Sequence, residues 1–390
     1  MERIGIYGGT FNPPHVGHLR AAQAAIDTLQ LDKLLLIPAC RCPDKETPET
    51  LPQHRVRMLE LLAGDAMEVS DMELRRGGTS YTVDTVKAVK AQHPDAKLYL
   101  CMGSDQFTAF ENWKDSDMIA SFADLCVFSR GSREEGKTIA QTKARLEAGG
   151  AQVAVVKNPI VPISSTDLRR LLVFGCAQPF LTEPVHRYIL ENGLYGTGEN
   201  YKNLPMEQLE TAVISLLKAN RVRHTLGCRD TAVELARRWG ADETDAARAG
   251  ILHDVTKALD GPLQLTLCEA YGKILSDFSK KYPKTLHAVT GSLVAQRIFG
   301  ENEAVVAAID SHTTGKANMN TLEKIIYVAD YMEPNRDFPG VEKLRYLAFT
   351  DLDAALKLGL EMTLVHLANQ GSEVSPESRE ALRYLNECGL

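Results

Sequence analysis

Short apolar runs alternate with longer stretches of helical periodicity through the first half of the chain. The apolar runs typical of strands cover Arg3–Tyr7, Lys33–Pro38, Lys97–Met102, Leu125–Ser129 and Gln152–Val156. Amphipathic stretches with the period of an α-helix lie between them at Leu19–Leu29, Gln53–Ala63 and Tyr81–Gln92. This alternation predicts an α/β domain with a parallel sheet, whose ligands bind beyond the carboxyl ends of the strands.

The pattern changes at the glycine-rich polar stretch Gly193–Asn200, which has no apolar period and is typical of a linker. Helical periods dominate beyond it, at Met206–Ala219, Thr225–Trp239, Glu243–Val255, Leu286–Ile298, Ala304–Ser311, Leu322–Tyr331, Asp351–Asn369 and Pro376–Glu387. We therefore predict an α/β domain over residues 1–197, a linker over 198–202 and an all-α domain over 203–390.

Composition narrows the class of protein. A length of 390 residues suits two domains. The formal net charge of −7 argues against a nucleic-acid or membrane-surface partner held by bulk electrostatics. No apolar stretch approaches the roughly 20 residues of a membrane helix, and the N-terminus MERIGIYGG shows no signal-peptide pattern. The eight cysteines form no disulfide or zinc framework. We expect a cytoplasmic protein.

The stretch GGTFNPPHVGH, residues 8–18, follows the first predicted strand. Gly8 and Gly9 allow a sharp bend and a close approach of the backbone to a ligand. The two prolines after Asn12 suit entry to a helix, whose first turn we expect to present unpaired N–H groups to a phosphate. His15 and His18 share one face of that turn, and we expect Gly17 to keep the face open for a base or ribose.

Histidines in this place can donate hydrogen bonds to phosphate oxygens and stabilise negative charge in a transition state. That suits a reaction that needs no protein nucleophile, in which a phosphate oxygen attacks the α-phosphate of a nucleoside triphosphate in line. A second stretch, Ile163–Arg169 (ISSTDLR), offers a helix capped by Ser164 and an arginine fork one turn in, at Arg169.

Together these motifs resemble the (H/T)xGH and ISxTxxR signatures of the nucleotidylyltransferases, and residues 1–196 are similar to bacterial nicotinate-nucleotide adenylyltransferases. The resemblance implies a Rossmann-like domain that uses Mg²⁺, ATP and nicotinate mononucleotide. It implies catalytic roles for His15, His18, Lys45, Ser164 and Arg169, although Asp44 replaces a histidine that often precedes this lysine in the family. Substrate contacts are implied for Gly8, Gly9, Thr10, Phe11, Thr82, Thr85, Gly103, Asp105, Trp113 and Ser165.

The second half contains histidines and aspartates on or beside apolar helical faces. They are His224, the adjacent pair His253 and Asp254, His287, His312 and Asp330. Neutral imidazoles and carboxylates suit first-row divalent metals, and two such metals support phosphoester or phosphoanhydride hydrolysis. We assign His224, His253, Asp254 and Asp330 to one metal. Asp254 would bridge to a second metal held by His287 and His312, and Lys257 would face the same site.

This order of ligands resembles the HD hydrolase superfamily, and over about residues 203–390 it is similar to the HD-domain symmetrical diadenosine tetraphosphate hydrolases. The resemblance implies hydrolysis of diadenosine tetraphosphate to two ADP at an iron-containing site, with manganese as the alternative metal. It also suggests that Arg336, in the stretch IYVADYMEPNR, binds a substrate phosphate.

The sequence thus predicts a bifunctional enzyme and leaves alternatives open in both halves. The first half could adenylylate nicotinamide mononucleotide or phosphopantetheine instead. The second could be a nucleotide-sensing regulatory module, or an HD nucleotidase that acts on monophosphates. Metal identity, oligomeric state and coupling between the halves do not follow from the sequence.

Overall fold

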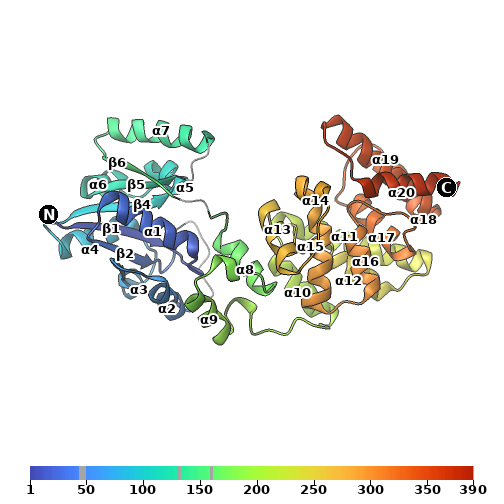
Figure 1. Ribbon diagram of the computed structural model, residues 1–390, viewed down its shortest axis with the longest axis horizontal. Helices are drawn as coiled ribbons and strands as arrows, with labels where there is room; N and C mark the ends of the chain where they lie inside the picture. The colour runs from blue at the N-terminus through green and yellow to red at the C-terminus, as the bar shows by residue number, and fades with distance from the viewer. Residues whose placement is uncertain (44–49, 130–132, 159–160, 390) are drawn as a thin grey trace. The chain divides into compact units, whose positions relative to one another are not determined.

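The computed structural model describes residues 1–43, 50–129, 133–158 and 161–389. The chain forms two compact units, Met1–Gly198 and Glu199–Leu390, each with its own core. Each unit is described by itself below (Figure 1). The first is an α/β unit and the second is helical, as the periodicity predicts.

Six strands form one sheet in the first unit, in the order β3-β2-β1-β4-β5-β6, and every neighbouring pair is parallel. Their bounds are β1 Arg3–Gly9, β2 Lys33–Pro38, β3 Met67–Val69, β4 Lys97–Gly103, β5 Ala123–Ser129 and β6 Val153–Lys157. The sequence predicts all of them except β3. This edge strand is only three residues long, too short to show a periodicity.

Helices α1–α7 lie in the connections between these strands, and α8 and α9 follow the last strand (Figure 1). They are α1 Val16–Leu29, α2 Pro52–Leu62, α3 Met72–Arg76, α4 Thr82–Gln92, α5 Ser104–Thr108, α6 Ser116–Phe122, α7 Arg133–Ala148, α8 Ser165–Val173 and α9 Glu183–Glu191. Alternate residues of β2 belong to two different apolar clusters: Leu34 and Leu36 to one, Leu35 and Ile37 to the other. The sheet is therefore buried on both faces, which leaves its carboxyl edge as the place for a site.

The second unit is built from helices alone in its described part. They are α10 Met206–Leu216, α11 Ala219–Trp239, α12 Glu243–Leu252, α13 Gly261–Ala270, α14 Asp277–Lys281, α15 Leu286–Val294, α16 Glu303–Ser311, α17 Thr321–Met332, α18 Val341–Thr350, α19 Leu352–Asn369 and α20 Pro376–Glu387. Helix α11 packs against α12 and α17, and α16 packs against α12, α15 and α17. These five helices carry the candidate metal ligands or end next to them.

None of the helices in the described ranges combines the length and apolarity that a membrane-spanning segment needs. All eight cysteines carry free thiols.

Candidate functional site

The first candidate site is the turn between β1 and α1, where His15 caps the start of the helix. Nδ1 of His15 accepts the N–H of Gly17 at 3.1 Å, and Nδ1 of His18 accepts the N–H of His15 at the same distance. A nitrogen that accepts a backbone N–H carries no proton, so the neutral form of each ring holds its proton on Nε2. Both histidines are thus set up as donors through Nε2.

The beginning of α1 differs from the sequence-based expectation. The N–H groups of Gly17, His18 and Leu19 are not unpaired, because the first is capped by the His15 ring and the other two donate to the His15 carbonyl. Gly17 also has a role in the cap of the helix. A Cβ at this position would lie 2.9 Å from the His15 ring, so glycine is needed to make room for the cap.

Helix α8 brings the second motif against the first. Ser164 caps α8 by accepting the N–H of Asp167 at 3.0 Å, and Ser165 donates to the carbonyl of Pro13 at 2.9 Å. Nη1 of Arg169 donates to the carbonyl of Asn12 at 2.7 Å. Two motifs about 150 residues apart in the sequence therefore meet at one turn.

Most of the remaining candidates of this unit are exposed or half-buried, and two are buried. Gly8 is exposed and a Cβ there would meet nothing within 4 Å, whereas Gly9 lies against the ring of Phe11. Gly103 is the last residue of β4 and Asp105 follows it by two residues. Thr10 lies in the turn itself, and Thr82 and Trp113 are half-buried.

Two of the candidates point into the protein. Phe11 is only 2% exposed and contacts Tyr7 and His18 edge-on. Thr85 is likewise 2% exposed, and its hydroxyl donates to Glu73 Oε1 at 2.5 Å and accepts from Arg76. The hydroxyl of Thr85 is therefore already used within the protein. Lys45 lies outside the described residues.

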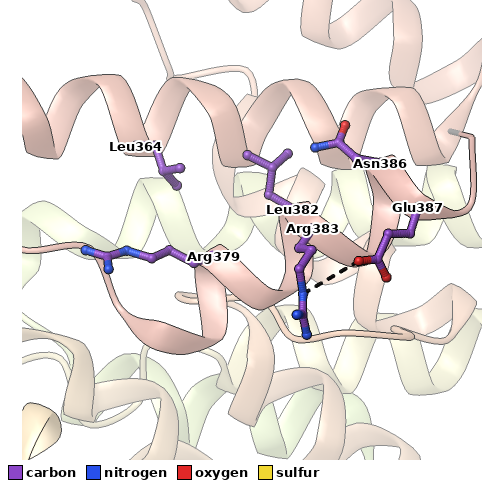
Figure 2. Close-up of a pocket in the computed structure, with 6 residues that line it drawn as sticks. All are labelled: Leu364, Arg379, Leu382, Arg383, Asn386 and Glu387. Atoms are coloured by element: carbon purple, nitrogen blue, oxygen red, sulfur yellow. Dashed lines mark ion pairs between the residues drawn. The ribbon is translucent and has the colours of Figure 1, made fainter.

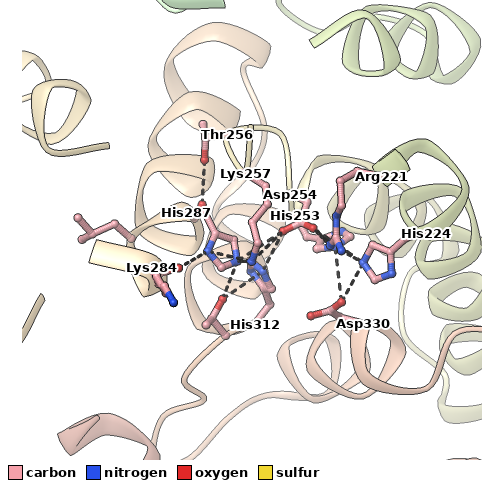
Figure 3. Close-up of polar contacts among 12 residues, drawn as sticks. Arg221, His224, His253, Asp254, Thr256, Lys257, Lys284, His287, His312 and Asp330 are labelled. Atoms are coloured by element: carbon pink, nitrogen blue, oxygen red, sulfur yellow. Dashed lines mark hydrogen bonds and ion pairs between the residues drawn. The ribbon is translucent and has the colours of Figure 1, made fainter. Parts of the chain in front are cut away.

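The second candidate site gathers side chains from five helices and the turns that follow them (Figure 3). His224 comes from α11, His287 from α15 and Asp330 from α17, while His253 and His312 are the C-caps of α12 and α16.

One group of ligand atoms surrounds Nε2 of His224. Nε2 of His253 lies 3.3 Å from it and Oδ1 of Asp330 lies 3.0 Å from it. Oδ2 of Asp254 lies 3.5 Å from Nε2 of His253 and 3.8 Å from Nε2 of His224. The ligand atoms of His224, His253 and Asp254 lie close enough together to hold one ion, and Asp330 lies beside the two histidines.

The other oxygen of Asp254 faces a second group. Oδ1 lies 3.4 Å from Nε2 of His287 and 3.9 Å from Nε2 of His312. Asp254 is 1% exposed and stands between the two groups with one oxygen toward each. This is the geometry that a carboxylate bridging two metals requires.

The four imidazoles of this site have the opposite protonation pattern to that of the first site. Nδ1 of His253 lies 2.7 Å from the Gly250 carbonyl and Nδ1 of His312 lies 2.6 Å from that of Ile309. Nδ1 of His287 lies 2.9 Å from the Lys284 carbonyl. A carbonyl only accepts, so Nδ1 carries the proton and Nε2 of the neutral ring keeps its lone pair for a metal.

Two of these histidines stay neutral over a wide pH range. Burial, with help from the nearby Lys257, lowers the pKa of His287 to about 3, and burial lowers that of His312 to about 4. Burial disfavours the ionised form of Asp254, but the neighbouring His253, His287 and Lys257 outweigh it and hold the pKa of Asp254 well below its usual range. Neutral imidazoles and an ionised carboxylate are the forms that bind metal.

Cationic side chains flank the ligand groups. Nζ of Lys257 lies 2.8 Å from Nε2 of His287, and Nη2 of Arg336 donates to Oδ1 of Asp330 at 2.7 Å. Arg221, on α11, forms an ion pair with Asp254. All three are partly exposed, so each could meet a phosphate.

Sequence reasoning did not single out Arg221, Thr313 or Glu333. Glu333 is 1% exposed and its Oε1 lies 3.0 Å from Nδ1 of His224. The Thr313 hydroxyl lies 3.1 Å from Nε2 of His287 and 3.2 Å from Nε2 of His312. The spacing in the sequence could have identified two of them. Arg221 precedes His224 by three residues and Glu333 follows Asp330 by three, about one helical turn in each case.

The donor set fits a pair of first-row divalent ions. It consists of four imidazole nitrogens and two carboxylates, the mixture of nitrogen and oxygen that such ions prefer, and the rings are oriented by carbonyls or by Glu333. A separate hollow of about 450 Å³ on α19 and α20 contains none of the candidate residues; it is lined by Leu364, Arg379, Leu382, Arg383, Asn386 and Glu387 (Figure 2).

Comparison with known proteins gives a match in each half. The Cytidylyltransferase-like family matches residues 6–171, and the HD domain matches residues 221–335. A protein of Gemmatimonas aurantiaca described as a probable nicotinate-nucleotide adenylyltransferase is 37% identical over 197 residues, 50% of this chain and 92% of that protein. One from Symbiobacterium thermophilum with the same description is 35% identical over 208 residues, 52% of this chain and 99% of that protein.

A third relative is named for a different activity from that of these two adenylyltransferases. It is the symmetrical bis(5'-nucleosyl)-tetraphosphatase of Bacillus subtilis, which is 39% identical over 173 residues, 44% of this chain and 92% of that protein.

Proposed function

Because the chain belongs to the nicotinate-nucleotide adenylyltransferase family in its first half and carries an HD domain in its second, we propose that it is a bifunctional enzyme. The first unit transfers the adenylyl group of ATP to nicotinate mononucleotide, with Mg²⁺, and forms deamido-NAD and pyrophosphate. The second unit hydrolyses diadenosine tetraphosphate to two ADP.

For adenylyl transfer, the main support is the tautomer of His15 and His18. An oxygen of the nicotinate mononucleotide phosphate attacks the α-phosphorus of ATP, and the bond to the β-phosphate oxygen breaks as pyrophosphate leaves. Nε2–H groups of the two rings can donate to phosphate oxygens as negative charge moves onto the leaving group. Arg169, beside the Asn12 carbonyl, and the helix start at Ser164 add positive charge.

The acceptor can be tested by competition. Full-length protein with ATP and Mg²⁺ would receive nicotinate mononucleotide, nicotinamide mononucleotide and phosphopantetheine in equal amounts, and chromatography would identify the adenylylated product. We expect deamido-NAD as the main product. A preference for either other acceptor would replace the substrate in this proposal while leaving adenylyl transfer in place.

For the hydrolase, the main support is Asp254 standing between two groups of imidazole nitrogens. A pair of divalent ions, iron or manganese, would supply activation of the attacking water and neutralisation of the phosphoryl charge. His224, His253, Asp254 and Asp330 would hold one ion, and Asp254, His287 and His312 the other. Lys257 and Arg336 would bind the phosphates on either side of the bond that breaks.

The hydrolase proposal is tested on full-length protein loaded anaerobically with iron or manganese and given diadenosine tetraphosphate. We expect ADP as the sole nucleotide product. AMP together with ATP would mean that the substrate is cleaved asymmetrically. No cleavage, with the metals shown to be bound, would exclude this substrate and favour a monophosphate nucleotidase or a nucleotide sensor; assays with AMP and with labelled nucleotides would separate these two.

A further inference from the structure

Arg55 is a buried guanidinium next to the first candidate site. It lies on α2 and is 1% exposed, although an arginine is expensive to bury and rarely occurs in a core. The neighbouring Arg57, on the same helix, is exposed and pairs with Glu60. The burial of Arg55 therefore needs an explanation, because Arg55 is not a solvated charge on the surface of a helix.

The contacts of Arg55 supply that reason. Its Nη1 donates to the carbonyl of Thr10 at 2.9 Å and to the carbonyl of Ala39 at 2.8 Å. Thr10 directly follows β1 and Ala39 directly follows β2, so one nitrogen joins the carboxyl ends of two adjacent parallel strands. The N–H of Ala39 closes the same connection by donating to the carbonyl of Gly9 at 2.8 Å.

The other carbonyls of the turn are held in a similar way. The carbonyl of Asn12 accepts from Arg169, and that of Pro13 accepts from Ser165. With Gly9 and Thr10, four carbonyl groups between residues 9 and 13 thus accept hydrogen bonds from other parts of the unit. A carbonyl oxygen turned toward a phosphate would repel it, and these four are fixed by protein donors instead.

We propose that Arg55 is a positioning residue for adenylyl transfer, which orients the turn at residues 8–14 so that its carbonyls are withdrawn from the triphosphate of ATP. This inference rests on the proposed adenylyl transfer. Arg55 acts through the backbone of Thr10 and Ala39 and not by contact with the nucleotide. Arg169 and Ser165 belong to a recognisable motif, whereas Arg55 is recognised only by its contacts.

The test compares Arg55→Met with Arg57→Met in the full-length protein. We expect Arg55→Met to raise the KM for ATP about tenfold or more and to lower kcat, because a displacement of about 1 Å in a positioning element costs on the order of 100-fold in rate. The KM for nicotinate mononucleotide should change less than twofold. Arg57→Met removes the same charge from the exposed face of the same helix and should leave all constants unchanged.

Arg55→Lys is the second variant, in case the methionine variant does not fold. Lysine keeps the charge but lacks the planar fork, so we expect a folded protein with a KM for ATP raised several-fold. Circular dichroism and the thermal unfolding of each variant show whether the first unit is folded. Wild-type constants in Arg55→Lys, or equal changes for both substrates in either variant, would overturn the positioning role; absence of adenylyl transfer from the wild-type protein would instead overturn the proposed function.

Discussion

The two candidate sites both depend on histidines, and they hold them in opposite tautomers. His15 stands at the start of α1, where backbone N–H groups need acceptors, and its Nδ1 accepts one of them. His253 and His312 stand at the ends of α12 and α16, where carbonyls need donors, and their Nδ1 atoms donate. In the neutral ring, Nε2 can donate a hydrogen bond at the first site, and at the second it offers a lone pair suited to a metal.

For His15, His253 and His312, the helix end that the histidine occupies accounts for its tautomer. His287 lies in the first turn of α15 and is a donor for another reason, because the Lys284 carbonyl lies 2.9 Å from its Nδ1. A donor nitrogen is suited to a phosphate oxygen and is unavailable to a metal, whereas a nitrogen with a lone pair is suited to a metal. The two sites also differ in how they are assembled. The first is largely one continuous stretch braced by α8, and the second takes its ligands from helices spread over more than 100 residues.

The largest expected effect separates the two activities completely. Asp254→Asn removes the charge that both ligand groups share, so we expect hydrolysis to fall at least about 10³-fold and metal content to drop. Adenylyl transfer should be unchanged. The measurements are metal analysis and both assays on one preparation. Retention of two metals with full hydrolysis would contradict the bridging role of Asp254.

A slightly smaller effect tests the donor tautomer of the first site. We expect His18→Ala to lower adenylyl transfer by about 10²- to 10³-fold, as for the loss of one transition-state donor. Hydrolysis should be retained. His18→Gln, whose amide nitrogen can take the place of the Nε2–H donor, should keep more activity than His18→Ala. Equal rates in the two variants would count against donation through Nε2.

The orientation of His224 provides the next comparison, because it alone of the four imidazoles is held by a carboxylate, that of Glu333. We expect Glu333→Ala to weaken metal binding about 10- to 100-fold. Glu333→Gln keeps an accepting oxygen and should lose less. Competition with a chelator measures the affinity directly, without relying on turnover, and an unchanged affinity in Glu333→Ala would refute this role.

The smallest effect concerns pH and the metal-free protein. His287 and His312 have pKa values of about 3 and about 4 in the folded state, below that of an unfolded histidine near 6.5. Between these values the unfolded chain binds more protons, so stability falls as pH falls below about 6.5. The loss approaches about 1.4 kcal/mol per pH unit for each histidine. Denaturant unfolding of the second unit at pH 7, 6 and 5 measures it, and His287→Gln should flatten the dependence.

Much of the fold could be predicted from the sequence because the relevant signals are local. Five strands of the sheet have continuous apolar runs, and long amphipathic periods mark helices such as α1, α17 and α20. The elements that escaped prediction include the short β3 and α14 and the longer helices α7, α13 and α18. In these segments the packing of the surrounding unit, and not the local pattern, determines the structure.

The residue types available at each site, and the two motifs that contain His18 and Arg169, can be read from the sequence alone. The sequence also contains the cause of the tautomers, because the partners of His15, His253 and His312 lie within three residues of them. The role of Gly17 cannot be read from the sequence, because it depends on where the His15 ring packs.

Which of these residues meet depends on how the helices and strands pack. This packing places Asp254 between two groups of imidazoles, Glu333 behind His224, and Arg55 beneath the turn at Thr10. The partner of Glu333 is 109 residues away, and that of Arg55 is 45 residues away. Contacts at such separations follow from the way whole helices and strands pack, which no local spacing in the sequence encodes.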